Sequence, residues 1–202
     1  MRTDMLVGVR EFAREAKWDL QSFEFNGAPF PVRDLLKFWS PSGCIVDACG
    51  FGVSPGVIAS AALKQTPTVY LGSEPSMMPR GATCVVHDAA SSANTAAKEL
   101  LSAGMKHFAF VGAKGKDWSG RRKEAFAAAL RLNGHEVVSM DITPMSSEVY
   151  GKETRFLRKW LNDIPKPCGI MAADDEIAAT ILAVCRLSGI AVPDEIAAGL
   201  TH

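Results

Sequence analysis

A strand, a helix and a second strand succeed one another in residues 83–112, which read TCVVHDAASSANTAAKELLSAGMKHFAFVG. The apolar runs at its two ends have the length of buried strands. Between them, Ala96, Ala97 and Leu100 recur at the spacing of one helix face. A strand, helix and strand in this order predict a βαβ unit, and hence a parallel sheet.

The same alternation continues in both directions from this stretch. The expected helices are 5–16, 32–39, 55–64, 89–103, 119–133, 150–163 and 175–188. The expected strands are 18–25, 44–49, 68–71, 83–86, 107–111, 135–141 and 169–172. We therefore expect an α/β fold of two Rossmann-like lobes with parallel sheets, an N-terminal lobe over 1–87 and a C-terminal lobe over 88–202.

The composition excludes several classes of protein. The 22 Lys and Arg side chains are matched by 22 Asp and Glu, so the formal net charge is zero and no basic surface for a nucleic acid is indicated. The apolar runs fall short of the roughly 18 residues of a membrane helix. The region after Met1 carries charges where a signal peptide has an apolar core. We therefore expect a cytoplasmic protein that binds neither a membrane nor, by itself, DNA.

The cysteines do not indicate metal or redox chemistry. No two of them form a Cys-x-x-Cys pair, and all five lie in apolar runs, at Cys44, Cys49, Cys84, Cys168 and Cys185. We expect them to be reduced thiols in the core, with neither a zinc site nor a disulfide framework.

Ligands of parallel α/β sheets collect at the carboxyl ends of the strands, so the residues that follow each strand are the site candidates. The junction from Gly50 to Gly56 has the spacing G-x-G-x-x-x-G, which approximates a dinucleotide-binding loop. Glu74, after the next strand, stands roughly where a ribose-binding acid would lie. A turn supplied with small residues explains the glycines equally well, so a Rossmann-type NAD(P)-binding oxidoreductase is kept as an alternative.

Asp88 ends a strand and opens a helix. Its carboxylate is expected to accept hydrogen bonds from the free backbone N–H groups of the first helical turn. The same carboxylate could also accept hydrogen bonds from ligand hydroxyls, because it projects from a strand end at the boundary between the lobes. His87 beside it is interpreted as a solvated loop residue.

Residues 116–126, KDWSGRRKEAF, place an aromatic ring and a guanidinium about one helical turn apart. Trp118 and Arg122 can therefore face the same cleft. An indole ring packs on the C–H face of a sugar, and a guanidinium donates directed hydrogen bonds to sugar oxygens. The alternative interpretation makes Trp118 a core residue and Arg122 an ion-pair partner of Glu124 or Asp117.

Asp174 and Asp175 follow an apolar strand and begin the next helix, so one can cap the helix while the other points outward. Paired carboxylates also suggest acid–base or metal chemistry. No His, Cys or third acid follows at ligand spacing, however, and no nucleophile stands in a G-x-S-x-G elbow. We therefore expect no enzymatic activity, no cofactor and no metal.

Three stretches together resemble a known family of sensor domains. They are the segment quoted above, residues 121–137, RRKEAFAAALRLNGHEV, and residues 169–197, GIMAADDEIAATILAVCRLSGIAVPDEIA. The chain resembles the periplasmic-binding-protein-like effector domain of LacI/GalR-type regulators, and most closely that of the xylose-operon regulators of the AraC family. The family positions are matched by Asp88, Gly112, Trp118, Arg122, Ala125, Phe126 and Asp175.

This resemblance implies a type I periplasmic-binding-protein-like fold and a function. The chain would be the effector-binding sensor of a sugar-responsive, xylose-like transcription regulator, with a monosaccharide between two lobes, lined by Asp88, Trp118, Arg122 and Asp175. A homodimer is expected, and DNA would be bound through a module that this chain lacks. The family pattern also predicts truncation at both ends, so that both lobes are incomplete. The solute-binding protein of a sugar transporter shares the fold and is kept as an alternative, although no secretion signal is seen.

Overall fold

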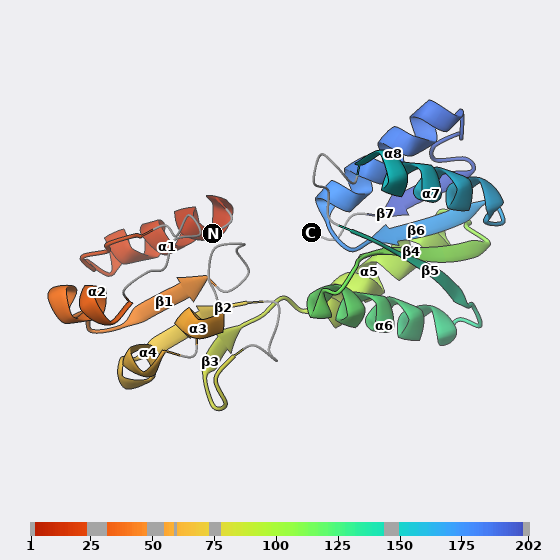
Figure 1. The fold of residues 1–202 in the computed structure, drawn as a ribbon. Helices are drawn as coiled ribbons and strands as arrows, with labels where there is room; N and C mark the ends of the chain where they lie inside the picture. The colour runs from red at the N-terminus through yellow and green to blue at the C-terminus, as the bar shows by residue number, and fades with distance from the viewer. Residues whose placement is uncertain are drawn as a thin grey trace. The chain divides into compact units, whose positions relative to one another are not determined.

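The protein consists of two compact units. The computed structural model describes residues 3–23, 32–47, 55–58, 60–72, 78–143 and 150–199. Unit 1 spans Met1–His87 and unit 2 spans Asp88–His202 (Figure 1). The interpretation of these units as two incomplete lobes of a larger fold stays a prediction.

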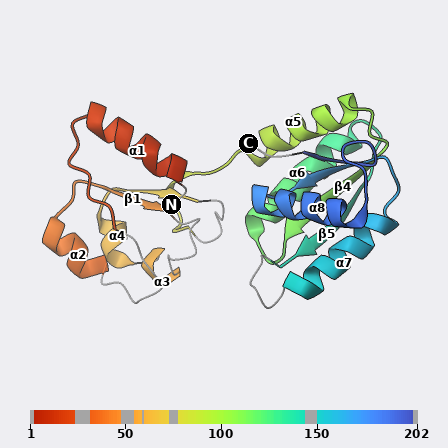
Figure 2. The same ribbon diagram turned by 90° about the horizontal axis from the view of Figure 1, so that it is seen from above.

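Unit 1 contains a three-stranded parallel sheet. Its strands, in spatial order, are β1 (Cys44–Asp47), β2 (Thr68–Leu71) and β3 (Thr83–Val85). One face of the sheet is covered by α1 (Thr3–Glu15). The opposite face carries α2 (Val32–Trp39), α3 (Pro55–Ile58) and α4 (Ala61–Gln65), as Figure 2 shows. The parallel pairing confirms the expected class of sheet.

Two expected elements of unit 1 are wrong. Residues 18–23 form no strand, and residues 24–25 lie outside the described part of the chain. A strand requires a hydrogen-bonded neighbour, and no described strand pairs with this segment. The helix expected over 55–64 is divided into α3 and α4. The carbonyl of Ile58, the last residue of α3, accepts a hydrogen bond from the Tyr70 hydroxyl at 3.3 Å.

Unit 2 is a three-layered α/β sandwich. Its parallel sheet has the spatial order β5 (Val137–Ile142), β4 (His107–Ala113), β6 (Cys168–Ala172) and β7 (Ile196–Gly199). One face carries α5 (Ala89–Ser102) and α6 (Asp117–Arg131). The other face carries α7 (Tyr150–Asp163) and α8 (Asp175–Ser188), as Figure 1 shows. The strand β7 was not expected from the sequence.

The core of unit 2 lies on both faces of this sheet. Every residue of β6 is buried, because helices cover the sheet on both sides. Gly169 allows α5 to approach closely, since a Cβ there would lie 3.1 Å from side-chain atoms of Leu100. Along the described segments, no helix is long and apolar enough to cross a bilayer.

Candidate functional site

Helices α5, α6 and α8 of unit 2 carry the predicted site residues, and all three start at the carboxyl edge of its sheet, as does α7. Strand β4 leads into α6 and β6 leads into α8 at this edge. Helix α5 returns through a short connection to the start of β4, so α5 runs antiparallel to β4 and also begins at the carboxyl edge. The predicted site residues lie at these three helix starts, Asp88 before α5, Trp118 and Arg122 in α6, and Asp175 in α8.

Arg122 is a buried cation with defined partners. The residue is only 8% exposed. Its Nη1 donates a hydrogen bond to the backbone carbonyl of Ala173, just after β6. Its Cζ lies 5.1 Å from the centroid of the Trp118 ring, a cation–π contact. Trp118 is half-buried and packs against the hydrophobic core. Burial of a charge is costly without such partners, so the indole and the guanidinium are held as one unit.

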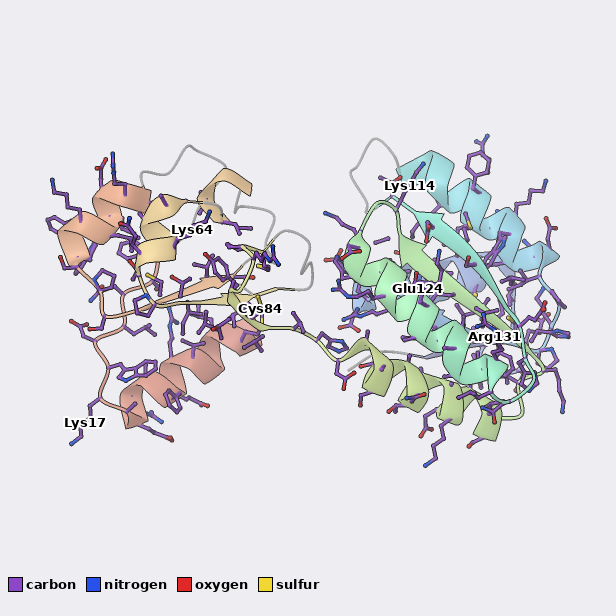
Figure 3. The ribbon with its side chains drawn as sticks, turned by 90° about the horizontal axis from the view of Figure 1, so that it is seen from below. Lys17, Lys64, Cys84, Lys114, Glu124 and Arg131 are labelled. Carbon is purple, nitrogen blue, oxygen red and sulfur yellow. The ribbon has the colours of Figure 1, made fainter. Side chains whose placement is uncertain are left out.

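The ion pair with Asp117 that was considered for Arg122 is formed by the neighbouring residue, Arg121. Asp117 Oδ2 accepts a hydrogen bond from Arg121 Nη1 at 2.7 Å, in a partly exposed salt bridge. Glu124 is exposed on the outer side of α6 (Figure 3). The structure therefore favours the interpretation in which Arg122 points toward the strand ends. The packing of Trp118 against the core also agrees with the alternative interpretation, in which Trp118 is a core residue.

Asp88 caps helix α5. Its Oδ1 accepts a hydrogen bond from the backbone N–H of Ser91 at 3.0 Å, and the residue is exposed. An ionised carboxylate has further lone pairs, so the capping bond is compatible with a contact to a ligand hydroxyl. His87 beside it is exposed, as expected.

The two acids at the start of α8 have different positions. Asp174 caps the helix, because its Oδ1 accepts a hydrogen bond from the backbone N–H of Ile177 at 2.8 Å. Asp175, in the first turn, is exposed. The sequence did not show which of the two acids caps the helix. In the structure Asp174 is the cap, and Asp175 lies on the surface. In the described part of the chain, no three His, Cys, Asp or Glu side chains are grouped to hold a metal.

Asp141 and Ser119 are two further polar side chains at this edge, and the sequence did not point to them. Gly112 of β4 pairs in register with Asp141 of β5. A Cβ on residue 112 would collide with the Asp141 carboxylate and would lie 2.8 Å from Ser119 Oγ. Ser119 is 2% exposed, and its Oγ accepts a hydrogen bond from the backbone N–H of Ala113 at 2.9 Å. A glycine at the end of a buried strand was the sequence signal, but the register of β4 with β5 was needed to explain it.

The cysteines of unit 2 are core thiols. Cys168 and Cys185 are buried. Burial raises the pKa of the Cys168 thiol to about 11, against a smaller opposite effect of Lys166. Cys44 and Cys84, in unit 1, are half-buried. The fifth cysteine, Cys49, lies outside the described residues.

The nucleotide-binding alternative falls largely outside the described residues. Positions 50–54 of the glycine-containing junction and Glu74 are not among them. Of this junction, the structure describes the backbone of Pro55 and Gly56, which begin α3. The structure therefore leaves the dinucleotide interpretation untested.

The fold and this edge together define a class of protein. Polar and aromatic side chains gather at the carboxyl ends of parallel strands, as they do in α/β domains that bind small ligands. A family model described as periplasmic binding protein-like domain matches residues 97–198. The chain belongs to this family.

Curated relatives confirm the resemblance to xylose-operon regulators. The xylose operon regulatory protein of Haemophilus influenzae is 31% identical over 104 residues, which cover 50% of this chain and 27% of that protein. The xylose operon regulatory protein of Escherichia coli K12 is 26% identical over 200 residues, which cover 95% of this chain and 49% of that protein. The match therefore spans about half the length of the Escherichia coli protein and a smaller share of the Haemophilus influenzae protein.

Solved structures confirm the fold. A xylose-binding transcription activator superposes with a TM-score of 0.77 at 24% identity, over 96% of this chain and 48% of that one. A periplasmic binding protein/LacI transcriptional regulator from Alkaliphilus metalliredigens, in complex with D-xylulofuranose, gives a TM-score of 0.69 at 14% identity. That match covers 96% of this chain and 70% of the other. The expected parallel α/β fold of the periplasmic-binding-protein type is thus confirmed.

Proposed function

We propose that this chain is the effector-binding part of a sugar-responsive transcription regulator and that it carries out no catalysis. The observation that carries the proposal is the Arg122–Trp118 pair. A guanidinium, buried and bonded to the Ala173 carbonyl, lies on an indole ring at the carboxyl edge of a parallel sheet. That edge is where ligands of this class of fold bind.

The chemistry of the four site residues suits a monosaccharide. The indole of Trp118 offers an apolar face for sugar C–H groups, and the planar guanidinium of Arg122 donates to hydroxyl or ring oxygens. The carboxylates of Asp88 and Asp175 accept hydrogen bonds from sugar hydroxyls. Because the Ala173 bond already fixes Arg122, little side-chain entropy is lost when a sugar binds.

The relatives support a pentose as the first effector to test. Two curated relatives are named for the xylose operon, and one solved neighbour is described as xylose-binding. Regulation requires no covalent step. A sugar that binds one conformation more tightly than another shifts the population toward it, and this shift is passed to DNA.

Contact with DNA is assigned to a separate module. The chain has a formal net charge of zero, which gives no strong attraction to a phosphate backbone. We place the DNA-binding module in another part of the regulator and expect the regulator to act as a homodimer.

Thermal unfolding of the purified chain tests the proposal. The melting temperature is measured alone and with D-xylose, D-ribose, D-glucose or NAD. At a sugar concentration of about 100 times Kd, mass action stabilises the folded chain by about 2.7 kcal/mol. Trp118→Ala and Arg122→Lys should each abolish this shift, whereas Arg131→Lys, at the exposed far end of α6, should retain it (Figure 3). A shift with NAD alone, or a sugar shift that survives in both site variants, would overturn the proposal.

A further inference from the structure

A pocket lies on the other side of α6 from the Trp118–Arg122 pair. Its volume is about 370 Å³, within the roughly 300–1,000 Å³ range of small-molecule sites. Its lining residues include Lys116, Asp117, Ser119, Gly120, Lys123 and Asp141. All of these side chains belong to unit 2, and neither Trp118 nor Arg122 lines the pocket.

The strand order separates this pocket from the proposed sugar site. Arg122 reaches the end of β6, through Ala173, whereas the pocket is lined by Asp141 near the end of β5. β5 and β6 flank β4 on opposite sides. On α6, Trp118 and Arg122 are four residues apart and share one face, and Gly120 and Lys123 lie on other faces. The same helix therefore presents two different sites.

The charges that line the pocket favour an anion. Asp117 is neutralised by its ion pair with Arg121 at 2.7 Å. Lys116 and Lys123 both line the pocket, and Asp141 is the only further acidic residue among its described lining residues. Among the described residues, no ion pair joins Lys123 to Asp141. The pocket thus holds both a net positive charge and a hydrogen-bond acceptor.

Small residues keep the pocket open, and a serine adds a donor. A Cβ on Gly120 would meet no atom within 4 Å, so this side of α6 is unfilled. Ser119 is held by the hydrogen bond that its oxygen accepts from Ala113 N–H. Its own O–H is free to rotate and donate. The pocket is therefore equipped with fixed polar groups around an open space.

We propose that this pocket is a second ligand site, for a small polyol that carries an anionic group. The anionic group binds to the ammonium groups of Lys116 and Lys123 and to the Ser119 O–H, and a ligand hydroxyl donates to Asp141. Sugar phosphates and sugar acids share this chemistry. Such a ligand would bind independently of the neutral sugar at Arg122.

Isothermal titration calorimetry on the whole chain tests the inference. The probes are ribose 5-phosphate, gluconate, inorganic phosphate and ribose. We expect ribose 5-phosphate or gluconate to bind at least about tenfold more tightly than both inorganic phosphate and ribose, and the better of the two identifies the anionic group. Failure of both anionic polyols to bind, or equal affinity for inorganic phosphate, would overturn the proposal.

Matched variants locate the binding. Gly120→Glu places a carboxylate in the pocket and should weaken the better probe by at least about tenfold, as should Lys123→Gln. Gly151→Glu is the control for Gly120→Glu, because it adds the same charge to α7 at a glycine that is equally open. Trp118→Ala should keep the affinity for the anionic probe. A loss of affinity in Gly151→Glu equal to that in Gly120→Glu, with unchanged melting temperatures, would show unspecific charge effects and refute the site.

Discussion

Gly112 of β4 lies beside Asp141 of β5, and the Asp141 carboxylate occupies the place that a Cβ on residue 112 would take. Ser119 Oγ, from α6, lies 2.8 Å from the same point. Two strands and a helix therefore meet over one Cα. Glycine at this position is required by close packing rather than by backbone conformation.

Gly112→Ala is expected to lower the free energy of unfolding by about 1–3 kcal/mol, because the added methyl group must displace Asp141 and Ser119. Gly151→Ala is the control, since a Cβ there meets nothing within 4 Å. It should leave stability unchanged or raise it by up to about 1 kcal/mol. Urea unfolding of both variants gives the comparison. If Gly112→Ala were as stable as the wild type, the described packing would be wrong.

Arg122→Ala is expected to cost about 1–3 kcal/mol of stability, because the buried Ala173 carbonyl loses a donor and Trp118 loses its cation. The neighbouring Arg121→Ala breaks a partly exposed ion pair and should cost less than about 1 kcal/mol. Denaturant titration of the two alanine variants measures both costs. Equal costs would mean that the burial of Arg122 contributes nothing to stability.

Asp88→Asn should separate capping from sugar binding. Asparagine is as good a helix cap as aspartate, so the melting temperature should stay close to that of the wild type. The affinity for the effector sugar should fall, because a charged acceptor is replaced by an amide. Asp88→Ala should lose about 1 kcal/mol of stability in addition. Unchanged sugar affinity in Asp88→Asn would restrict Asp88 to its capping role.

The two acids of α8 should respond in opposite ways. Asp174→Ala removes the cap on Ile177 N–H and should cost about 1 kcal/mol of stability. Asp175→Asn, at an exposed position, should leave stability within about 0.5 kcal/mol and weaken sugar binding. Parallel melting and calorimetric titration of both variants checks this. A sugar affinity that falls in Asp174→Ala and not in Asp175→Asn would exchange their roles.

Cys168 should make stability depend on alkaline pH. Burial raises the pKa of its thiol from 9.0 to about 11, so the folded protein holds this proton more tightly than the unfolded chain. The resulting stabilisation is present below pH 9 and is lost as pH rises toward 11, by up to about 3 kcal/mol. The stability difference between wild type and Cys168→Ala should therefore shrink over this range. A difference that does not vary with pH would show that the thiol does not titrate there.

Much of unit 2 could be predicted because its strands and helices carry complete local patterns. The limits of α7 and α8 agree with the expected 150–163 and 175–188. The strand β7 was missed, since Ile196–Gly199 is a short run of small residues that becomes a strand by pairing with β6. The strand expected over 18–25 failed for the opposite reason, because its alternating pattern finds no partner strand in the described residues.

The candidate site could be predicted as far as local spacing reaches. The four-residue interval between Trp118 and Arg122 shows that their side chains share a helix face, and the contact at 5.1 Å follows from it. The hydrogen-bond partner of Arg122, however, is a backbone carbonyl 51 residues further along the chain. The pocket around Lys123 likewise depends on which strand lies beside β4. Both features arise from tertiary structure, which local sequence patterns do not contain.

The residue whose carbonyl holds Arg122 is followed directly by Asp174, the cap of α8. The first turns of α6 and α8 are therefore mechanically joined through one guanidinium and one peptide unit. A ligand that binds Arg122 would therefore be connected to the start of α8 through Ala173, without touching that helix. One side chain thus links the strand edge to the start of α8, through a contact with Ala173, which lies 51 residues further along the chain than Arg122.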